Sequence, residues 1–283
     1  MKKLSFSQFG VMSAMYQQFG LEYCVESVAS NGFHYLDFWG GAGHYSAFDV
    51  PESCRRARVR EIRNLLSDWG LEMSVFTAEQ SCLYPINVAS SNSFVRQNSI
   101  ELVKKYIEDT KEFGARYFFL QMGYPLFDED AGEAFRRSVE ALRMLAEYAE
   151  QLGVRMVMEQ LQKYESPFCC NRDMLKRFID MVGSPFLTAC VDCVAAAAAG
   201  ETPEEYYRVF GTVSHVHLAD GCPTGHLCPG DGENPLADYL RVFAEHGFDQ
   251  SVTLEINNQR YFDDPDQAAA RAARWLRECS AVE

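Results

Sequence analysis

Short apolar runs alternate with longer segments of helical periodicity along the whole chain of 283 residues. Each apolar run ends in polar turn residues, which is typical of strands buried on both faces. The eight runs that predict strands are residues 3–10, 33–39, 71–77, 115–121, 154–160, 186–192, 213–219 and 251–257. Apolar positions three or four residues apart predict helices at 21–31, 53–69, 94–113, 132–152, 171–182, 203–210, 235–246 and 265–279.

Residues that begin and end helices flank several of these segments. Thr202, Pro203 and Glu205 are spaced as a helix cap, a first helical residue and the return partner of a capping box. Asp264 and Pro265 repeat the first two positions before the last helix. Glycine, which commonly ends helices in the left-handed conformation, follows most of the helices. These glycines are Gly32, Gly70, Gly114, Gly153, Gly183, Gly211 and Gly247.

Strict alternation of strand and helix predicts a parallel sheet. Eight units in a chain of this length predict an α/β fold of the (β/α)8 TIM barrel type, with residues 1–283 forming one domain. A doubly wound open sheet is the alternative. It is disfavoured because no strand is followed by a GxGxxG or P-loop motif, and the "GGAG" at 40–43 lacks the third glycine.

The composition narrows the class of function. Hydrophobic residues make up 47% of the chain and charged residues 23%, which favours a globular protein with a large core. The net charge of −14 argues against nucleic acid as a partner, and the basic cluster at 55–60 fits a solvated helix face. No run reaches the roughly 18 apolar residues of a membrane span. The first ten residues lack the apolar core of a signal peptide, so we expect a cytoplasmic protein.

Ten cysteines are scattered along the chain. In a large intracellular protein, most cysteines act as small buried hydrophobes. The "CVDC" at 190–193 has the spacing of half a zinc site, but no second pair completes it. In a strand, Cys190 and Asp192 would face one way and Cys193 the other, which is poor geometry for two thiolates on one metal.

Polar residues stand at the ends of four consecutive predicted strands. They are Glu159, Asp192, His217 and Glu255. Because the chemistry of a TIM barrel lies at the carboxyl ends of its strands, these side chains should meet at one rim. Three carboxylates and an imidazole suit a divalent metal ion, with Mn²⁺ foremost and Mg²⁺, Co²⁺ or Ni²⁺ also fitting. His215, on the same face and one layer deeper, is predicted to be a partner of the site rather than a ligand.

These motifs resemble the xylose-isomerase-like TIM barrels of the sugar isomerase/epimerase superfamily, and in particular the ketose and fructoselysine 3-epimerases. The resemblance covers the whole chain. Its motifs are "DFWGGAGH" at 37–44, "LYPIN" at 83–87, "EQLQKYES" at 159–166, "CVDC" at 190–193 and "GHLCPGDG" at 225–232. It implies the same four metal ligands, and it implies that Glu165, Trp39, His44 and His226 contact a sugar substrate.

Two positions depart from the pattern of the epimerases that act on free ketoses. Those enzymes carry a His three residues after the metal-binding Asp and an Arg six residues after the metal-binding His. This chain has Ala195 and Pro223 there. Both missing side chains hold the O1–O3 end of a free ketose. The resemblance therefore implies a sugar whose C1 bears something other than a hydroxyl, as in a ketosamine.

The predicted reaction is removal and return of a proton next to a carbonyl through an enediolate, with Glu159 and Glu255 as the acid/base pair. Three alternatives stay open. The first is the catalytic subunit of a C-glycoside deglycosidase, which would need a partner subunit. The second is an endonuclease IV-type nuclease, and the third is a non-catalytic sugar-binding barrel. The six histidines and the acidic charge disfavour the nuclease. For the epimerase we expect a small-molecule sugar substrate and a homo-oligomer, with neither nucleic acid nor membrane as a partner.

Overall fold

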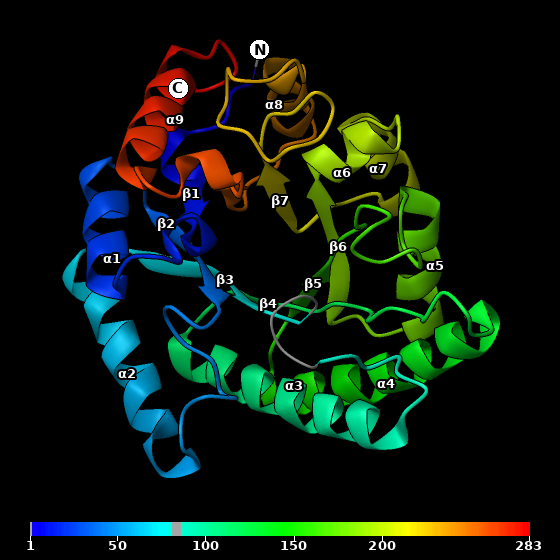
Figure 1. Ribbon diagram of the computed structural model, residues 1–283. Helices are drawn as coiled ribbons and strands as arrows, with labels where there is room; N and C mark the ends of the chain where they lie inside the picture. Colours follow the sequence, from blue (N-terminus) through cyan, green and yellow to red (C-terminus); the bar gives the residue numbers. More distant parts are fainter. Residues whose placement is uncertain (1, 81–85) are drawn as a thin grey trace.

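A computed structural model of the chain describes residues 2–80 and 86–283 (Figure 1). Its parallel strands close into one barrel in the order β1 to β8, with β1 hydrogen-bonded to β8. This confirms the predicted (β/α)8 architecture. The strands are β1 Phe9–Met12, β2 Tyr35–Gly40, β3 Glu72–Ala78, β4 Tyr117–Phe119, β5 Met156–Met158, β6 Leu187–Asp192, β7 His215–Leu218 and β8 Val252–Leu254. In the motif predicted at 83–87, residues 83–85 lie outside the described part.

The helices surround the barrel, as Figure 1 shows. They are α1 Leu21–Ser30, α2 Glu52–Asp68, α3 Ser93–Phe113, α4 Ala131–Leu152, α5 Arg172–Val182, α6 Cys193–Ala198, α7 Pro203–Phe210, α8 Leu236–Glu245 and α9 Pro265–Glu278. None of the helices in the described ranges is both long and apolar enough to cross a membrane.

The predicted helix ends are within one residue of those observed, because local capping fixes them. Thr202 and Glu205 form the predicted capping box at the start of α7, and Asp264 accepts a hydrogen bond from the backbone N–H of Gln267 at the start of α9. All seven predicted helix-ending glycines have φ between 70° and 84°. In this left-handed region a residue with a Cβ is strained.

Several strands, such as β4 and β8, are shorter than the predicted runs that contain them, and two elements differ further from the prediction. The first strand begins at Phe9 rather than at residue 3, because Ser5 caps a short 3-10 helix over Phe6–Gln8. Upstream of that helix, Leu4 instead pairs with Val282, so the two ends of the chain lie side by side. The helix α6 was not predicted. It begins directly after β6, where Asp192 accepts a hydrogen bond from the backbone N–H of Val194.

Apolar side chains fill the barrel below its carboxyl end. Val75, Tyr117, Phe119, Val157 and Cys190 form a buried cluster contributed by β3 to β6. A larger core lies between the strands and the surrounding helices. The barrel is therefore a packed scaffold and not a pore, and its polar interior groups need a separate explanation.

A buried ion-pair cluster joins α2 to α3. The guanidinium of Arg55, which is 4% exposed, contacts Glu108 at 2.6 Å and also contacts the buried carboxylate of Asp109. The hydroxyl of Tyr45 donates to Asp109 at 2.5 Å. Each charge is thus paired and hydrogen-bonded, which is the condition for holding charges away from water.

Candidate active site

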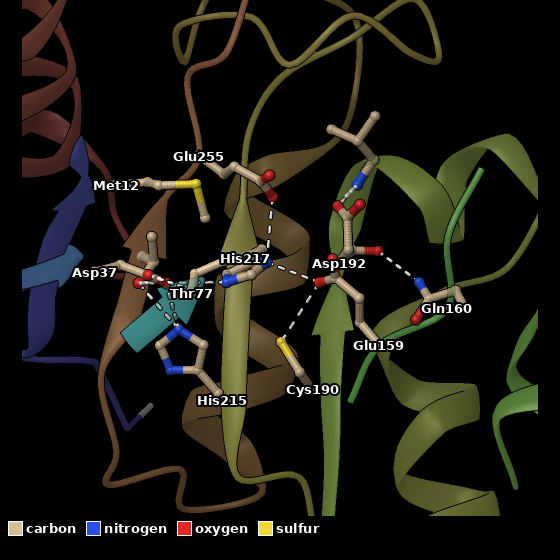
Figure 2. Close-up of polar contacts among 12 residues, drawn as sticks. Met12, Asp37, Thr77, Glu159, Gln160, Cys190, Asp192, His215, His217 and Glu255 are labelled. Atoms are coloured by element: carbon tan, nitrogen blue, oxygen red, sulfur yellow. Dashed lines mark hydrogen bonds and ion pairs between the residues drawn. The ribbon is translucent and has the colours of Figure 1, made fainter. Parts of the chain in front are cut away.

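The four predicted metal ligands lie together at the carboxyl end of the barrel (Figure 2). Glu159 follows β5 directly, Asp192 is the last residue of β6, His217 lies in β7 and Glu255 follows β8 directly. Strand register aligns them, since Asp192 pairs with His217, and His217 pairs with Thr253 two residues before Glu255. The aligned carboxyl ends of β5 to β8 therefore place the four side chains at the same height along the barrel axis.

The Nδ1 atom of His217 is the centre of the cluster. It lies 2.7 Å from Oε2 of Glu159 and 3.2 Å from Oε2 of Glu255. Despite these short distances, neither Nδ1 of His217 nor Oε2 of Glu255 has a hydrogen-bond partner within the described residues, and both atoms are buried. Buried polar atoms that converge without hydrogen bonding are the pattern expected around a cation.

Asp192 divides its two carboxylate oxygens between structure and site. Its Oδ1 accepts a hydrogen bond from the backbone N–H of Val194 at 2.7 Å and so caps α6. Its Oδ2 lies 3.7 Å from Nε2 of His226 and faces the cluster. The side-chain amide of Gln160 donates to the backbone carbonyl of Asp192 at 2.8 Å. The strand end is thereby fixed, and one carboxylate oxygen stays available to a ligand.

The charges of the cluster are crowded in a low-dielectric setting. Burial raises the pKa of Glu159 to about 8; the charges of Asp192 and Glu255 add to the rise, and His217 opposes it. Burial alone would lower the pKa of His217, but the surrounding anions hold it well above its usual range. A divalent cation held by Glu159, Asp192, His217 and Glu255 would relieve the repulsion, so the donor set fits a hard or borderline metal.

Two further predicted site residues, Glu165 and His226, face this cluster from loops. Burial raises the pKa of Glu165 to about 7, with the charges of Asp192 and Glu255 adding to the rise. Burial would lower the pKa of His226, but the carboxylates of Glu255, Asp192 and Glu165 raise it to about 10. His226 Nε2 is 3.7 Å from Oε2 of Glu255, which places the imidazole beside the predicted metal ligands.

The remaining two predicted site residues lie on the β2 side. The indole of Trp39 packs with Met12 and Ala14 and donates to Glu79 at 3.2 Å. Gly41 is required beside it, because a Cβ there would lie 1.8 Å from the ring. His44 instead faces away, with Nε2 3.2 Å from the carbonyl of Phe19. No described contact joins His44 to the carboxylates, so its predicted role in substrate binding stays a prediction.

Sequence reasoning missed two interior residues. Asp37 of β2 is fully buried and contacts Nε2 of His217 at 3.1 Å. Cys190, interpreted only as a hydrophobe, places its thiol 3.7 Å from Oε2 of Glu159. The signal for Asp37 was an acid inside the apolar run at 33–39, since a buried carboxylate requires a partner. The alternation of strand faces placed Cys190 on the same side as Asp192, but nothing in the sequence placed its thiol beside Glu159.

Comparison with known sequences agrees with the barrel fold. The sequence model of the family described as xylose isomerase-like TIM barrel matches residues 25–279. The fructoselysine 3-epimerase of Shigella flexneri is 26% identical over 271 residues, which span 95% of this chain and 96% of that protein.

Solved structures with the same fold cover almost the whole chain. A 3-keto-D-glucoside 4-epimerase from E. coli superposes with a TM-score of 0.79 at 15% identity, over 96% of this chain and 99% of that one. A D-psicose 3-epimerase from Clostridium cellulolyticum H10 superposes with a TM-score of 0.77 at 18% identity, over 96% of this chain and 98% of that one. At these identities the superpositions show the fold alone.

Proposed function

Because the chain belongs to the xylose isomerase-like TIM barrel family, we propose that it is a metal-dependent sugar epimerase. The observation that carries the proposal is the convergence of Glu159 and Glu255 on Nδ1 of His217. Two carboxylates beside one metal-binding nitrogen can serve two faces of a carbon next to a carbonyl. The full-length similarity to a protein named fructoselysine 3-epimerase supports the same reading.

Glu159, Asp192, His217 and Glu255 would hold one divalent ion, for which we propose Mn²⁺. Such an ion polarises a carbonyl oxygen and stabilises the negative charge that develops on it when a neighbouring proton leaves. Asp192 contributes the oxygen that does not cap α6. The buried Nδ1 of His217 and Oε2 of Glu255, which make no hydrogen bond within the described residues, are the features of this chain that fit such an ion.

Glu159 and Glu255 carry out the proton transfers in this proposal. They follow β5 and β8, so two further strands, β6 and β7, separate their points of attachment. One carboxylate removes the proton from the carbon to give an enediolate, and the other returns a proton to the opposite face. Positioned acid–base groups of this kind typically contribute roughly 10²–10⁴-fold each.

The substrate class we propose is a ketose substituted at C1, such as a ketosamine. Ala195 is buried in α6, where the free-ketose enzymes would carry a His, and an exposed Pro223 replaces their Arg. Glu165 and His226 are the polar groups that face the same space from the β5–α5 and β7–α8 loops. An apolar indole such as that of Trp39 suits one face of a sugar.

Solvent exchange tests the proposal. The purified protein, stripped of metal and then reloaded with Mn²⁺, is incubated in D₂O with free ketohexoses, fructosamines including fructoselysine, and a 3-keto C-glycoside. Metal-dependent deuterium incorporation next to the carbonyl, with epimerisation of a C1-substituted ketose, is the expected result. Cleavage of the C-glycoside without epimerisation would assign a lyase instead. Absence of exchange into every sugar, with metal bound, would favour a non-catalytic barrel.

A further inference from the structure

Asp37 lies at the centre of a buried polar chain inside the barrel. Its Oδ2 is 3.1 Å from Nε2 of His217 and accepts from the Thr253 hydroxyl at 3.2 Å. Its Oδ1 accepts from the Thr77 hydroxyl at 2.6 Å. The residue is 0% exposed, and Figure 2 shows it on the side of His217 opposite Glu159. Among the described residues, no Lys or Arg pairs with this acid, so its burial needs a reason other than an ordinary ion pair.

The hydrogen bonds fix the roles of the partners. Both threonine hydroxyls donate to Asp37, so the carboxylate acts as an acceptor on both oxygens. Nε2 of His217 must then donate to it. Deeper in the barrel, Nε2 of His215 lies 3.0 Å from Oγ1 of Thr253. Because the only hydroxyl proton of Thr253 is donated to Asp37, Nε2 of His215 must donate to Oγ1.

One consequence concerns the metal ligand directly. A neutral imidazole has a proton on one nitrogen only, so a proton on Nε2 of His217 leaves the lone pair on Nδ1. Nδ1 is the atom that faces Glu159 and Glu255. In metal sites, a carboxylate on the far nitrogen of a ligand His fixes its tautomer and its ring orientation.

We propose that Asp37 is a positioning residue that holds His217 in the Nε2–H tautomer and so presents Nδ1 as a metal ligand. This inference rests on the proposed metal-dependent function. Asp37 does not contact substrate; it acts through His217. Thr77 and Thr253 orient the Asp37 carboxylate.

Two variants at position 37 test the proposal in a graded way. Asp37→Leu removes both acceptor oxygens at similar size, whereas Asp37→Asn keeps one acceptor oxygen and loses the charge. Mn²⁺ affinity, measured by the electron paramagnetic resonance signal of free Mn²⁺, should fall about 10- to 100-fold for Leu and by a smaller factor for Asn. Asp109→Asn, an equally buried acid on α3 outside the barrel, is the matched control and should leave Mn²⁺ affinity unchanged.

Nitrogen NMR of the side chains supplies a readout that a purely structural role would not move. The chain has six histidines, and a His217→Gln variant identifies the signals of His217. In the metal-free protein, at a pH where its imidazole is neutral, His217 should be the Nε2–H tautomer in wild type and Asp37→Asn, and should shift toward the Nδ1–H tautomer in Asp37→Leu, because Glu159 and Glu255 then offer the nearest acceptors. If Asp37→Leu fails to fold, the affinity of Asp37→Asn decides.

The outcomes separate this inference from the proposed function. Folded Asp37 variants that bind Mn²⁺ within twofold of wild type, or a His217 tautomer unchanged in metal-free Asp37→Leu, would overturn the role of Asp37 alone. If the wild type binds no divalent ion at Glu159 and His217, the proposed metal-dependent function fails first.

Discussion

A two-base mechanism makes a prediction that a one-base mechanism does not. If Glu159 and Glu255 each serve one face of the reacting carbon, each substrate epimer loses its proton to a different carboxylate. Glu159→Gln and Glu255→Gln should therefore both abolish epimerisation. Each variant should still exchange the proton of one epimer with solvent, and the two variants should retain opposite epimers.

The size of the effect follows from what the substitution removes. Gln keeps the volume and one oxygen of the buried Glu159 and the partly buried Glu255, so packing changes little. What is lost is proton transfer, which typically contributes roughly 10²–10⁴-fold. At about 1.4 kcal/mol per tenfold, this corresponds to about 2.7–5.5 kcal/mol of barrier on the affected face. Exchange on the other face should stay within about tenfold of wild type.

The assay follows loss of the C–H proton signal of each pure epimer in D₂O by NMR at saturating Mn²⁺, with metal content verified. Saturation matters because each Gln also removes one of the three carboxylates from the metal site. The control is Glu129→Gln. Glu129 is a loop residue whose carboxylate pairs with Arg137, and this variant should exchange the proton of both epimers at the wild-type rate. If both variants, loaded with metal, retain exchange of the same epimer, the assignment of opposite faces is refuted.

Three further predictions concern stability and the substrate side. Chelation should lower the melting temperature by roughly 4–5 °C relative to protein at a free Mn²⁺ concentration 100 times its Kd, since that binding adds about 2.7 kcal/mol; an unchanged melting curve would contradict a structural metal contribution. Arg55→Met leaves Asp109 buried without its cation and should cost about 3–5 kcal/mol in urea denaturation, whereas a loss below about 1 kcal/mol would show that the pair is dispensable. Gly41→Ala should displace the Trp39 ring, which would shift tryptophan fluorescence and raise KM several-fold with a smaller effect on kcat; unchanged KM despite a fluorescence shift would remove Trp39 from substrate binding.

The features that could be predicted from the sequence are those that repeat or that depend on nearby residues. Helix ends were predictable because Thr202, Asp264 and the terminal glycines act through hydrogen bonds within a few residues. The convergence of Glu159, Asp192, His217 and Glu255 was predictable because a closed parallel barrel brings its strand ends to one rim. In both cases, residues recognisable from their near neighbours in the sequence act within a backbone geometry that is the same in many proteins.

The features that were missed depend on contacts between distant parts of the chain. Asp37 lies 180 residues from His217, and only the closed barrel brings β2 opposite β7. The start of β1 was misplaced because the side chain of Gln8 makes two hydrogen bonds. It accepts from the backbone N–H of Ser5 and donates to the carbonyl of Gln250 near β8. These hydrogen bonds compete with an extended conformation of residues 5–8. The short helix α6 was missed because Asp192 fits equally well as a strand-end ligand and as a helix cap; the structure shows the cap, and the ligand role stays a proposal.

In the proposed function, the loops that seat the sugar would determine which carbon reacts. The β7–α8 loop of this chain is held in a defined conformation. Asp220 accepts backbone hydrogen bonds from Gly221, Gly230 and Asn234, which ties both ends of the loop together.

That loop holds His226 at φ 47°, a left-handed conformation that a non-glycine residue adopts at some energetic cost. The surrounding hydrogen bonds, including that from Asn258 to the carbonyl of Gly225, offset this cost and keep the imidazole beside Asp192 and Glu255. A preformed His226 and Glu165 are therefore the groups with which a C1-substituted sugar would be selected. In the proposed mechanism, Glu159 and Glu255 would transfer the protons, and the two loops would select the carbon at which they act.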